Sequence, residues 1–405
     1  MGRTYMVKEM ELAFFEAVKA IGLSEPNPAV GAVLIPKEKN LPIVFGHTQK
    51  AGDKHAEAIA IEKAKKQNLP LKQYKLVVTL EPCSHYGRTP PCTLAIQQAQ
   101  IPEVIIAVKD PNPMAKGGSE ALFKSGIKIQ FIEEQLIREN FFLPYVWTLL
   151  PFLKKIKTSL PLFTLKWAQT KEGHLAPLTG SSGKISSEDA NQFVHSLRVL
   201  HRSVYASAGS VAYDFARLNV RLQYPISIKP KIWQNIFDSA YKNRSLHTYR
   251  IFEMPKQTSA FTQMDFQKWF KMQKAINEHF FLILLKNHPD FHFYRQMPEI
   301  AKYLMVADNE QQALATLTQD FSNRVLVEAG PKKSEWWLKK KIPDILVILA
   351  SHVKSISAGR GNSFSYKLAQ AISKGNTIPS PEGYHLLDWF EVGDDRIFMF
   401  IKEDL

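Results

Sequence analysis

The chain of 405 residues contains only two cysteines, Cys83 and Cys92, and both lie in one short segment. One disulfide bridge cannot hold together a protein of this length, so a disulfide scaffold is excluded. Two free thiols this close together are typical of metal binding or of chemistry. Taken alone, they would also suit two small buried apolar positions.

A histidine and a glutamate upstream favour the metal. The chain reads His55-Ala56-Glu57 at the start of a predicted helix, Pro82-Cys83 after a predicted strand, and Pro91-Cys92 at the start of another helix. One imidazole and two thiolates form a three-ligand set for Zn²⁺ that leaves the fourth position open for water, as in catalytic zinc sites. A carboxylate at Glu57 can carry a proton from that water to a leaving amine. The order of these residues matches the zinc deaminase signature, although the gap between the cysteines exceeds the two residues usual there.

This longer gap identifies a family. From Thr79 to Cys92 the chain reads TLEPCSHYGRTPPC, which resembles the pyrimidine deaminase of riboflavin biosynthesis. Shorter matches at 26–28, 30–33, 46–47, 50–52 and 110–113 extend the resemblance over residues 7–145. The resemblance implies removal of the 2-amino group from a diamino-hydroxy-pyrimidine that carries a ribosylamino phosphate. It also implies substrate contacts from Asn27, His47, His85 and Asn112.

The chemistry of these residues agrees in kind with such a substrate. Asn27 and Asn112 lie on proline-bounded turns and offer amide groups to the edge of a heterocycle. His85 and Arg88 lie between the two cysteines, where they can hold a phosphate. An asparagine in a turn more often only shapes the turn, so both interpretations stay open.

In this family a reductase domain of the dihydrofolate reductase type commonly follows and uses NADPH to open the ribose into a ribityl chain. The C-terminal part resembles it: Lys166 with Gly173 matches the opening strand and turn, residues 195–198 match the helix motif, and Glu328 with Gly330-Pro331 matches the late turn. The resemblance implies substrate contacts from Lys166, Ser182, Arg198, Asp214, Leu218, Arg221 and Glu328. It implies cofactor contacts from Ser207, Gly209, Ser210 and Gly330.

Departures from the family pattern gather where the cofactor is expected. The family's Val-Gly-x-Gly-Thr turn reads Ala206-Ser207-Ala208-Gly209-Ser210 here, and Ala329 replaces a glycine of the late turn. A glycine lets the backbone approach a phosphate closely, and an added Cβ can block that approach, so we predict weak NADPH affinity. Three interpretations stay open: a working reductase with unusual cofactor contacts, which we favour, a domain that binds substrate but not NADPH, and an oligomerisation or partner-binding domain.

Hydrophobic patterning predicts two α/β domains. In the first, we expect strands at 30–35, 42–45, 75–80, 104–108 and 127–132 and helices at 10–21, 55–66 and 92–100. Segment 141–160, with two prolines, predicts a packed linker. In the second, we expect strands at 162–168, 204–208, 325–328, 345–350 and 396–402 and a helix at 187–200, whereas 222–298 gives no clear pattern. With the resemblance, the fold class is α/β: a cytidine-deaminase-like three-layer domain at 1–147, then a dihydrofolate-reductase-like α/β domain at 148–405.

The net charge of +14 divides into +3 over residues 1–150 and +11 over residues 151–405. Such a charge can attract nucleic acid or phosphorylated small molecules. A nucleic-acid deaminase needs a basic, aromatic groove near its zinc. Because the zinc-bearing part is close to neutral and carries the small-nucleotide loop, we expect a phosphorylated pyrimidine substrate rather than RNA or DNA.

Two features of the sequence bear on location. The uncharged stretch Phe141–Leu153 is shorter than the roughly 18 apolar residues that a membrane span needs, and prolines interrupt it. The charged N-terminal residues are not followed by the apolar core of a signal peptide. We therefore expect a cytoplasmic protein, and we expect it to form a homo-oligomer.

Overall fold

The computed structural model describes residues 2–38, 40–115, 117–177, 185–221, 231–243, 248–259, 261–320, 322–351 and 359–405. The chain folds into two compact units. The first comprises Met1–Leu160 with Asn235–Ser245, and the second comprises Pro161–Gln234 and Leu246–Leu405. None of the helices in these ranges combines the length and the apolar character needed to cross a bilayer.

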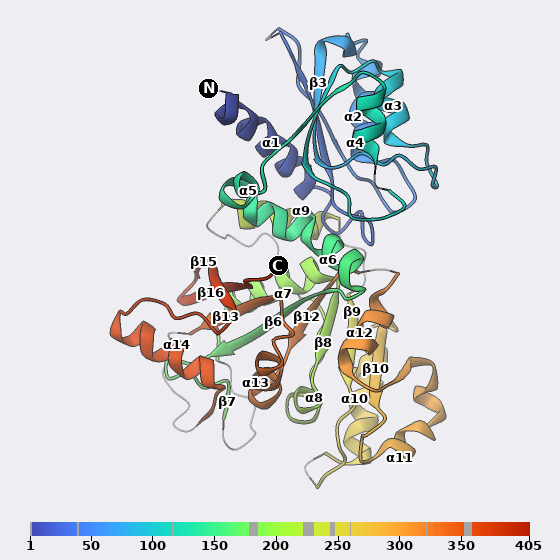
Figure 1. Ribbon diagram of the computed structural model, residues 1–405. Coiled ribbons are helices and arrows are strands. Elements are labelled where there is room, and N and C mark those ends of the chain that lie inside the picture. The colour runs from blue at the N-terminus through green and yellow to red at the C-terminus, as the bar shows by residue number, and fades with distance from the viewer. Residues whose placement is uncertain are drawn as a thin grey trace. The chain divides into compact units, whose positions relative to one another are not determined.

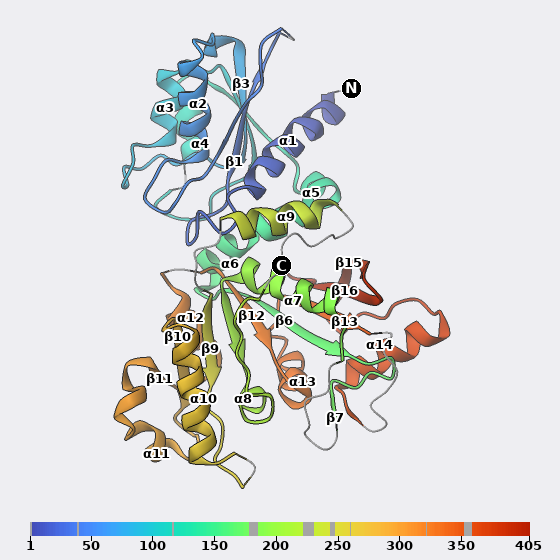
Figure 2. The same ribbon diagram turned by 180° about the vertical axis from the view of Figure 1, so that it is seen from behind.

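The first unit contains a five-stranded sheet. Helices lie on both of its faces (Figures 1 and 2). Its elements are α1 (Gly2–Val18), β1 (Gly31–Pro36), β2 (Val44–His47), α2 (Ala56–Lys66), η1 (Leu71–Gln73), β3 (Tyr74–Leu80), α3 (Cys92–Gln98), β4 (Glu103–Val108), α4 (Gly118–Lys124), β5 (Lys128–Phe131), α5 (Glu134–Thr148) and α6 (Leu150–Thr158). The strand order is β2-β1-β3-β4-β5; β1 is antiparallel to both neighbours, and β3, β4 and β5 run parallel. Helices α2, α3 and α4 lie on one face and α1 on the other (Figures 1 and 2), which confirms the predicted three-layer domain.

Two glycines set how closely helices approach this sheet. A Cβ on Gly31 of β1 would lie 2.0 Å from the carbonyl oxygen of Ala13 in α1. A Cβ on Gly46 of β2 would lie 2.2 Å from the carbonyl oxygen of Ala56, the first residue of α2. The missing side chains therefore let the helix backbones touch the strands, and the second contact fixes the start of α2.

The predicted linker at 141–160 is wrong, because the structure forms α5 and α6 there. Pro144 lies inside α5, and Pro151 lies in the first turn of α6, where a helix needs no backbone N–H donor. The side chains of Trp147 and Leu153 are buried, so packing outweighs the local preference against helix. The predicted boundary at 147/148 falls at the end of α5, whereas the first unit continues through α6.

The second unit contains a nine-stranded sheet and a separate two-stranded sheet. Its elements are β6 (Leu162–Gln169), β7 (Ala176–Pro177), α7 (Glu188–His201), β8 (Ser203–Ala206), α8 (Ala208–Asp214), β9 (Tyr249–Glu253), α10 (Gln263–Ile276), β10 (Phe280–Leu285), α11 (Phe291–Arg295), η2 (Pro298–Tyr303), β11 (Leu304–Ala307), α12 (Glu310–Thr318), β12 (Arg324–Glu328), α13 (Pro331–Lys339), β13 (Ile345–Ala350), β14 (Gly359–Arg360), α14 (Ser363–Lys374), β15 (Tyr384–Val392) and β16 (Asp395–Lys402). Helix α9 (Lys231–Lys242) belongs to the first unit from residue 235 onward.

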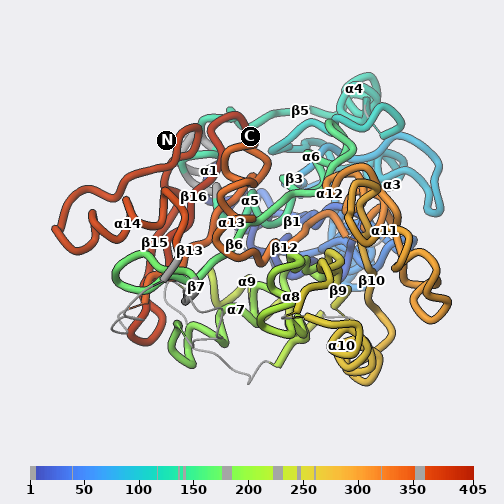
Figure 3. Tube along the Cα trace, turned by 90° about the horizontal axis from the view of Figure 1, so that it is seen from below, coloured from blue at the N-terminus to red at the C-terminus, as the bar shows by residue number. Residues whose placement is uncertain are grey.

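The strand order of this sheet is β11-β10-β9-β8-β12-β6-β13-β16-β15. The strands from β11 to β13 run parallel, and β16 and β15 close the edge antiparallel. Helices α7 and α10 lie on one side of the sheet and α12 and α13 on the other (Figure 3). Ala206, Glu253 and Glu328 end three adjacent parallel strands, so they meet at one edge, where α/β sheets bind ligands.

Candidate functional site

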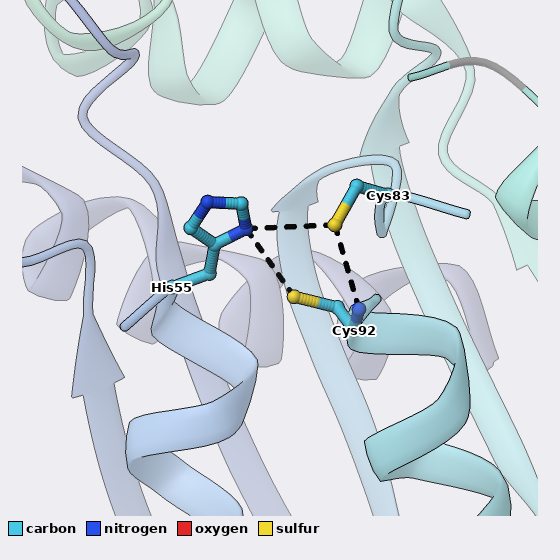
Figure 4. Close-up of side chains that lie close together, drawn as sticks. All are labelled: His55, Cys83 and Cys92. Carbon is cyan, nitrogen blue, oxygen red and sulfur yellow. Dashed lines mark hydrogen bonds between the residues drawn. The ribbon is translucent and has the colours of Figure 1, made fainter. Parts of the chain in front are cut away.

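Three predicted zinc ligands converge at one end of the first sheet (Figure 4). His55 is the N-cap of α2, Cys83 follows the end of β3, and Cys92 is the first residue of α3. His55 Nδ1 lies 3.6 Å from Cys83 Sγ and 3.4 Å from Cys92 Sγ. The three donor atoms all lie within 4.8 Å of one another.

These separations fit zinc. Tetrahedral Zn–N and Zn–S bonds of about 2.1 and 2.3 Å place a nitrogen and a sulfur ligand about 3.6 Å apart. Hydrogen bonds from Cys92 and His55 lower the pKa of the Cys83 thiol to about 4, against burial that raises it, so Cys83 is held in the thiolate form that binds metal. The hydrogen bond to Cys83 and burial raise the pKa of the Cys92 thiol, so in the absence of metal the two sulfurs share a proton. Two cysteine sulfurs and one imidazole nitrogen at these distances match the ligand preferences of Zn²⁺.

Glu57 lies in the first turn of α2, two residues after His55, and is buried. Burial is the largest influence on this carboxyl group, and it raises the pKa of Glu57 to about 6. A carboxyl group with a pKa close to neutrality can both accept and return a proton at working pH. A buried carboxyl group therefore lies beside the three donors, and its role as a proton carrier stays a prediction.

The five predicted substrate residues of this unit differ in how they are held. Asn27 is half-buried in the turn before β1. Asn112 uses its Oδ1 to accept from Met114 N at 3.1 Å, so its side-chain oxygen serves the turn, as the alternative interpretation allowed. Arg88 is exposed and extends over Gly52.

The other two residues, His85 and His47, differ in the hydrogen bonds of their ring nitrogens. His85 lies in the loop between the cysteines, and its Nδ1 is buried without a hydrogen-bond partner in the described part of the chain. His47 ends β2, and its Nδ1 lies 2.7 Å from Glu16 Oε1. An unsatisfied buried ring nitrogen is the kind of group that a ligand completes.

Two buried carboxylates near this site were not predicted. Glu81 directly precedes Pro82-Cys83 and accepts hydrogen bonds from Asp110 N at 3.2 Å and from Ser119 Oγ at 2.6 Å. It therefore ties the Asp110–Asn112 turn to the end of β3. Glu16 lies on α1, where the buried face carries Glu9 as well as apolar residues; an acidic residue on that face is its signal in the sequence.

Comparison with known proteins agrees with this geometry. Residues 6–108 match the family described as "Cytidine and deoxycytidylate deaminase zinc-binding region". The riboflavin biosynthesis protein RibD of Aquifex aeolicus is 34% identical over 334 residues, which cover 80% of this chain and 86% of that protein. The chain belongs to the RibD family. The RibD of Escherichia coli is 30% identical over 361 residues, covering 85% of this chain and 86% of that protein.

Solved structures share the whole fold. RibD of Acinetobacter baumannii superposes with a TM-score of 0.73 at 24% identity and covers 99% of this chain and 100% of that one. A Thermotoga maritima protein, a "diaminohydroxyphosphoribosylaminopyrimidine deaminase/ 5-amino-6-(5-phosphoribosylamino)uracil reductase", reaches 0.71 at 23% identity with coverage of 99% and 100%. Membership of the RibD family confirms an enzyme of riboflavin biosynthesis with a zinc-dependent deaminase domain and a reductase domain, and it confirms the expected cofactors Zn²⁺ and NADPH. It does not favour a deaminase alone.

In the second unit, a cavity of about 350 Å³ opens at the ends of β8 and β12. Six residues expected to contact substrate or cofactor line it: Arg198, Ser210, Asp214, Leu218, Arg221 and Glu328. Lys166 joins them, with its Nζ 3.7 Å from Glu328 Oε2. Sequence positions more than 160 residues apart therefore meet here as the RibD resemblance implied, while Ser182 lies outside the described residues.

Glu328 is the electrostatic centre of this cavity. Arg198 donates to it twice, from Nε at 2.6 Å and from Nη2 at 3.0 Å. Burial raises the pKa of Glu328, but Arg198 and Lys166 outweigh burial and lower the pKa to about 2. Burial has the opposite effect on the imidazole of His195, whose pKa it lowers to about 4. The Nδ1 atom of His195 accepts a hydrogen bond from the Arg221 backbone N–H at 3.2 Å. Neutral His195 thus fixes the Arg221 backbone at the cavity rim.

The turns expected to hold NADPH flank this cavity. Ser207 is the N-cap of α8 and Gly330 the N-cap of α13. A Cβ on Gly209 or on Gly330 would meet nothing within 4 Å, so open space borders both turns, which fits a bound dinucleotide. The Ala208 N–H is already used, because it donates to Glu253 Oε2 at 3.1 Å. A cofactor phosphate must therefore be held by other donors, and weak NADPH affinity remains a prediction.

Proposed function

We propose that this chain carries out two successive reactions on one phosphorylated pyrimidine. The first unit deaminates diaminohydroxyphosphoribosylaminopyrimidine, and the second reduces 5-amino-6-(5-phosphoribosylamino)uracil with NADPH. The substrates named for the Thermotoga maritima protein of the same fold support this assignment. The single observation that carries it is the convergence of His55, Cys83 and Cys92 beside buried Glu57.

For the deamination, His55, Cys83 and Cys92 would hold Zn²⁺, a Lewis acid that would lower the pKa of a water molecule so that it can lose a proton and attack at neutral pH. Glu57 accepts a proton from the attacking water and returns it to the departing amino group. The carbon–nitrogen bond breaks, a carbonyl oxygen replaces the amine, and ammonia leaves. Asn27, His47 and Asn112 orient the ring and sugar, and His85 with Arg88 holds the phosphate.

For the reduction, NADPH supplies the hydride that converts the ribosyl group into a ribityl chain. Ser207, Gly209, Ser210 and Gly330 border the space for the cofactor. Lys166, Arg198 and Glu328 form a fixed charged surface that positions the sugar. Asp214, Leu218 and Arg221 complete the wall of the cavity on the substrate side. Ser182 is assigned to the substrate from the resemblance alone.

A single assay tests both halves. The diamino-pyrimidine ribosyl phosphate is supplied with NADPH, and ammonia release and NADPH oxidation are followed in parallel. We expect ammonia first and NADPH oxidation after it. Ammonia without NADPH oxidation would overturn the reductase assignment, and no ammonia would overturn the deaminase assignment. A cytoplasmic location and a homo-oligomeric state remain predictions from the sequence.

A further inference from the structure

We propose that Glu16 is a positioning residue of the deaminase: it fixes the ring of His47 so that His47 Nε2 accepts a hydrogen bond from the substrate. The proposal rests on the proposed function, which places His47 at the substrate. Glu16 lies on α1 and His47 lies at the end of β2, 31 positions apart in sequence, with 2.7 Å between Glu16 Oε1 and His47 Nδ1.

The packing of α1 explains this contact. Gly31 pairs with His47 across β1 and β2, and the backbone of α1 rests directly on Gly31, where no Cβ intervenes. Glu16 lies between Ala13 and Ala17, the two residues nearest to Gly31, so its side chain reaches the neighbouring strand. The close helix contact thus delivers a carboxylate to His47.

The strands next to His47 connect it to the predicted zinc ligands. The Gly31 N–H donates to Thr79 Oγ1 at 3.2 Å, and Thr79 lies in β3 four residues before Cys83. His47 is therefore two strand spacings, about 10 Å, from the strand that delivers the first cysteine ligand. At this distance His47 can contact a part of the substrate that lies away from the reacting carbon.

Glu16 is built to hold one tautomer of His47. Its side chain is 4% exposed, and Lys19 Nζ binds its second oxygen, Oε2, at 2.6 Å. Burial raises the pKa of Glu16, but the hydrogen bonds from His47 and Lys19 outweigh burial and lower it, so the group stays ionised at neutral pH. An ionised carboxylate can only accept, so Nδ1 must carry the proton.

The other ring nitrogen is left for a ligand. His47 is 23% exposed, and its Nε2 makes no hydrogen bond to the part of the chain that the structure describes. When the ring is neutral, a proton on Nδ1 leaves a lone pair at Nε2, which accepts from an O–H or N–H group. This is a specific polar feature to offer to a ribosylamino-pyrimidine.

The test replaces Glu16 with glutamine in the full chain. An amide can donate or accept, so Glu16→Gln removes the preference for one tautomer while keeping the size of the side chain. Glu9→Gln is the matched control, because Glu9 is also buried on α1 and pairs with Lys75 Nζ at 2.7 Å, away from His47. We expect Glu16→Gln to raise the KM for the diamino-pyrimidine about 3- to 10-fold, the range for one hydrogen bond, with kcat within about twofold and zinc content unchanged.

Two further measurements separate positioning from general damage. In a His47→Gln background, adding Glu16→Gln should change KM no further. The ¹⁵N chemical shifts of the His47 ring, assigned by their loss in His47→Gln, should show Nδ1 protonated in the wild type and a mixture of tautomers in Glu16→Gln but not in Glu9→Gln.

Each contrary result has a distinct meaning. An unchanged KM in Glu16→Gln, or an equal rise in Glu9→Gln, would overturn the role of Glu16. A wild-type chain that releases no ammonia would overturn the proposed function instead. In that case the ¹⁵N shifts of the His47 ring still test the role of Glu16. Identical shifts in the wild type and Glu16→Gln would reject that role.

Discussion

Replacing Glu328 with glutamine should make the stability of the second unit depend less on pH in the acid range. The pKa of Glu328 is about 2, against an ordinary value of 4.5, because Arg198 and Lys166 outweigh the effect of burial. A lowered pKa contributes stability that is fully present above 4.5 and is lost as pH falls toward 2. The contribution at pH 7 is about 3 kcal/mol, of which about 2 kcal/mol is lost by pH 3.

The variant also leaves Arg198 and Lys166 buried without their carboxylate, which costs about 3–5 kcal/mol at pH 7. The difference in stability between wild type and variant should therefore shrink by about 2 kcal/mol between pH 7 and pH 3. Hydrogen exchange of peptides covering β12 in a urea series reports the stability of this unit separately.

A surface ion pair in the same unit provides the control. Glu278 pairs with Lys302 at 2.9 Å, and both side chains are 61% exposed, so Glu278→Gln should change the stability little at either pH. If the pH dependence of Glu328→Gln runs parallel to that of the wild type, the electrostatic account of this cavity is refuted.

Three further predictions concern other parts of the chain. Cys83→Ser should lose the bound zinc, measured by atomic emission, and should no longer release ammonia. Its NADPH oxidation with supplied reductase substrate should continue. Stoichiometric zinc in the variant would contradict the ligand assignment. Gly46→Ala should push α2 away from β2, since its Cβ would lie 2.2 Å from the Ala56 carbonyl oxygen, and lower the stability of the first unit by about 1–3 kcal/mol in calorimetry. Ser207→Gly should tighten NADPH binding in a fluorescence titration, because it restores a free approach at the turn; an unchanged Kd would argue against Ser207 as the cause of weak affinity.

The grouping of His55, Cys83 and Cys92 was predictable because its information is local. His55 and Cys92 each begin a helix, and Cys83 follows a buried β-branched strand, so the short motifs already imply where each side chain points. Three donors of the right chemistry at three element ends leave few arrangements, and the structure has the expected one.

Long-range packing decided what could not be predicted. Segment 141–160 reads as a linker from its prolines, yet it is helical because Trp147 and Leu153 are buried. Within 222–298, β9 and β10 join the parallel sheet, and Trp269 of α10 packs edge-on against Phe252 of β9. Aromatic residues in a stretch without clear periodicity do not reveal which strands they will pair with.

The contact of Glu16 with His47 also depends on long-range packing and could not be predicted from the sequence. Its partner His47 lies on another element, and only the contact of α1 with Gly31 brings them together. An acidic residue on a largely apolar helix face was the available signal, but Glu9 carries the same signal and neither residue's partner can be read from it.

The central claim is that one zinc centre with Glu57 as proton carrier performs the deamination. The most direct test measures zinc content and ammonia release in Glu57→Gln beside the wild type. We predict one equivalent of zinc in both proteins and a loss of turnover of at least about 100-fold in the variant. Near-normal ammonia release from the zinc-loaded variant would contradict the account.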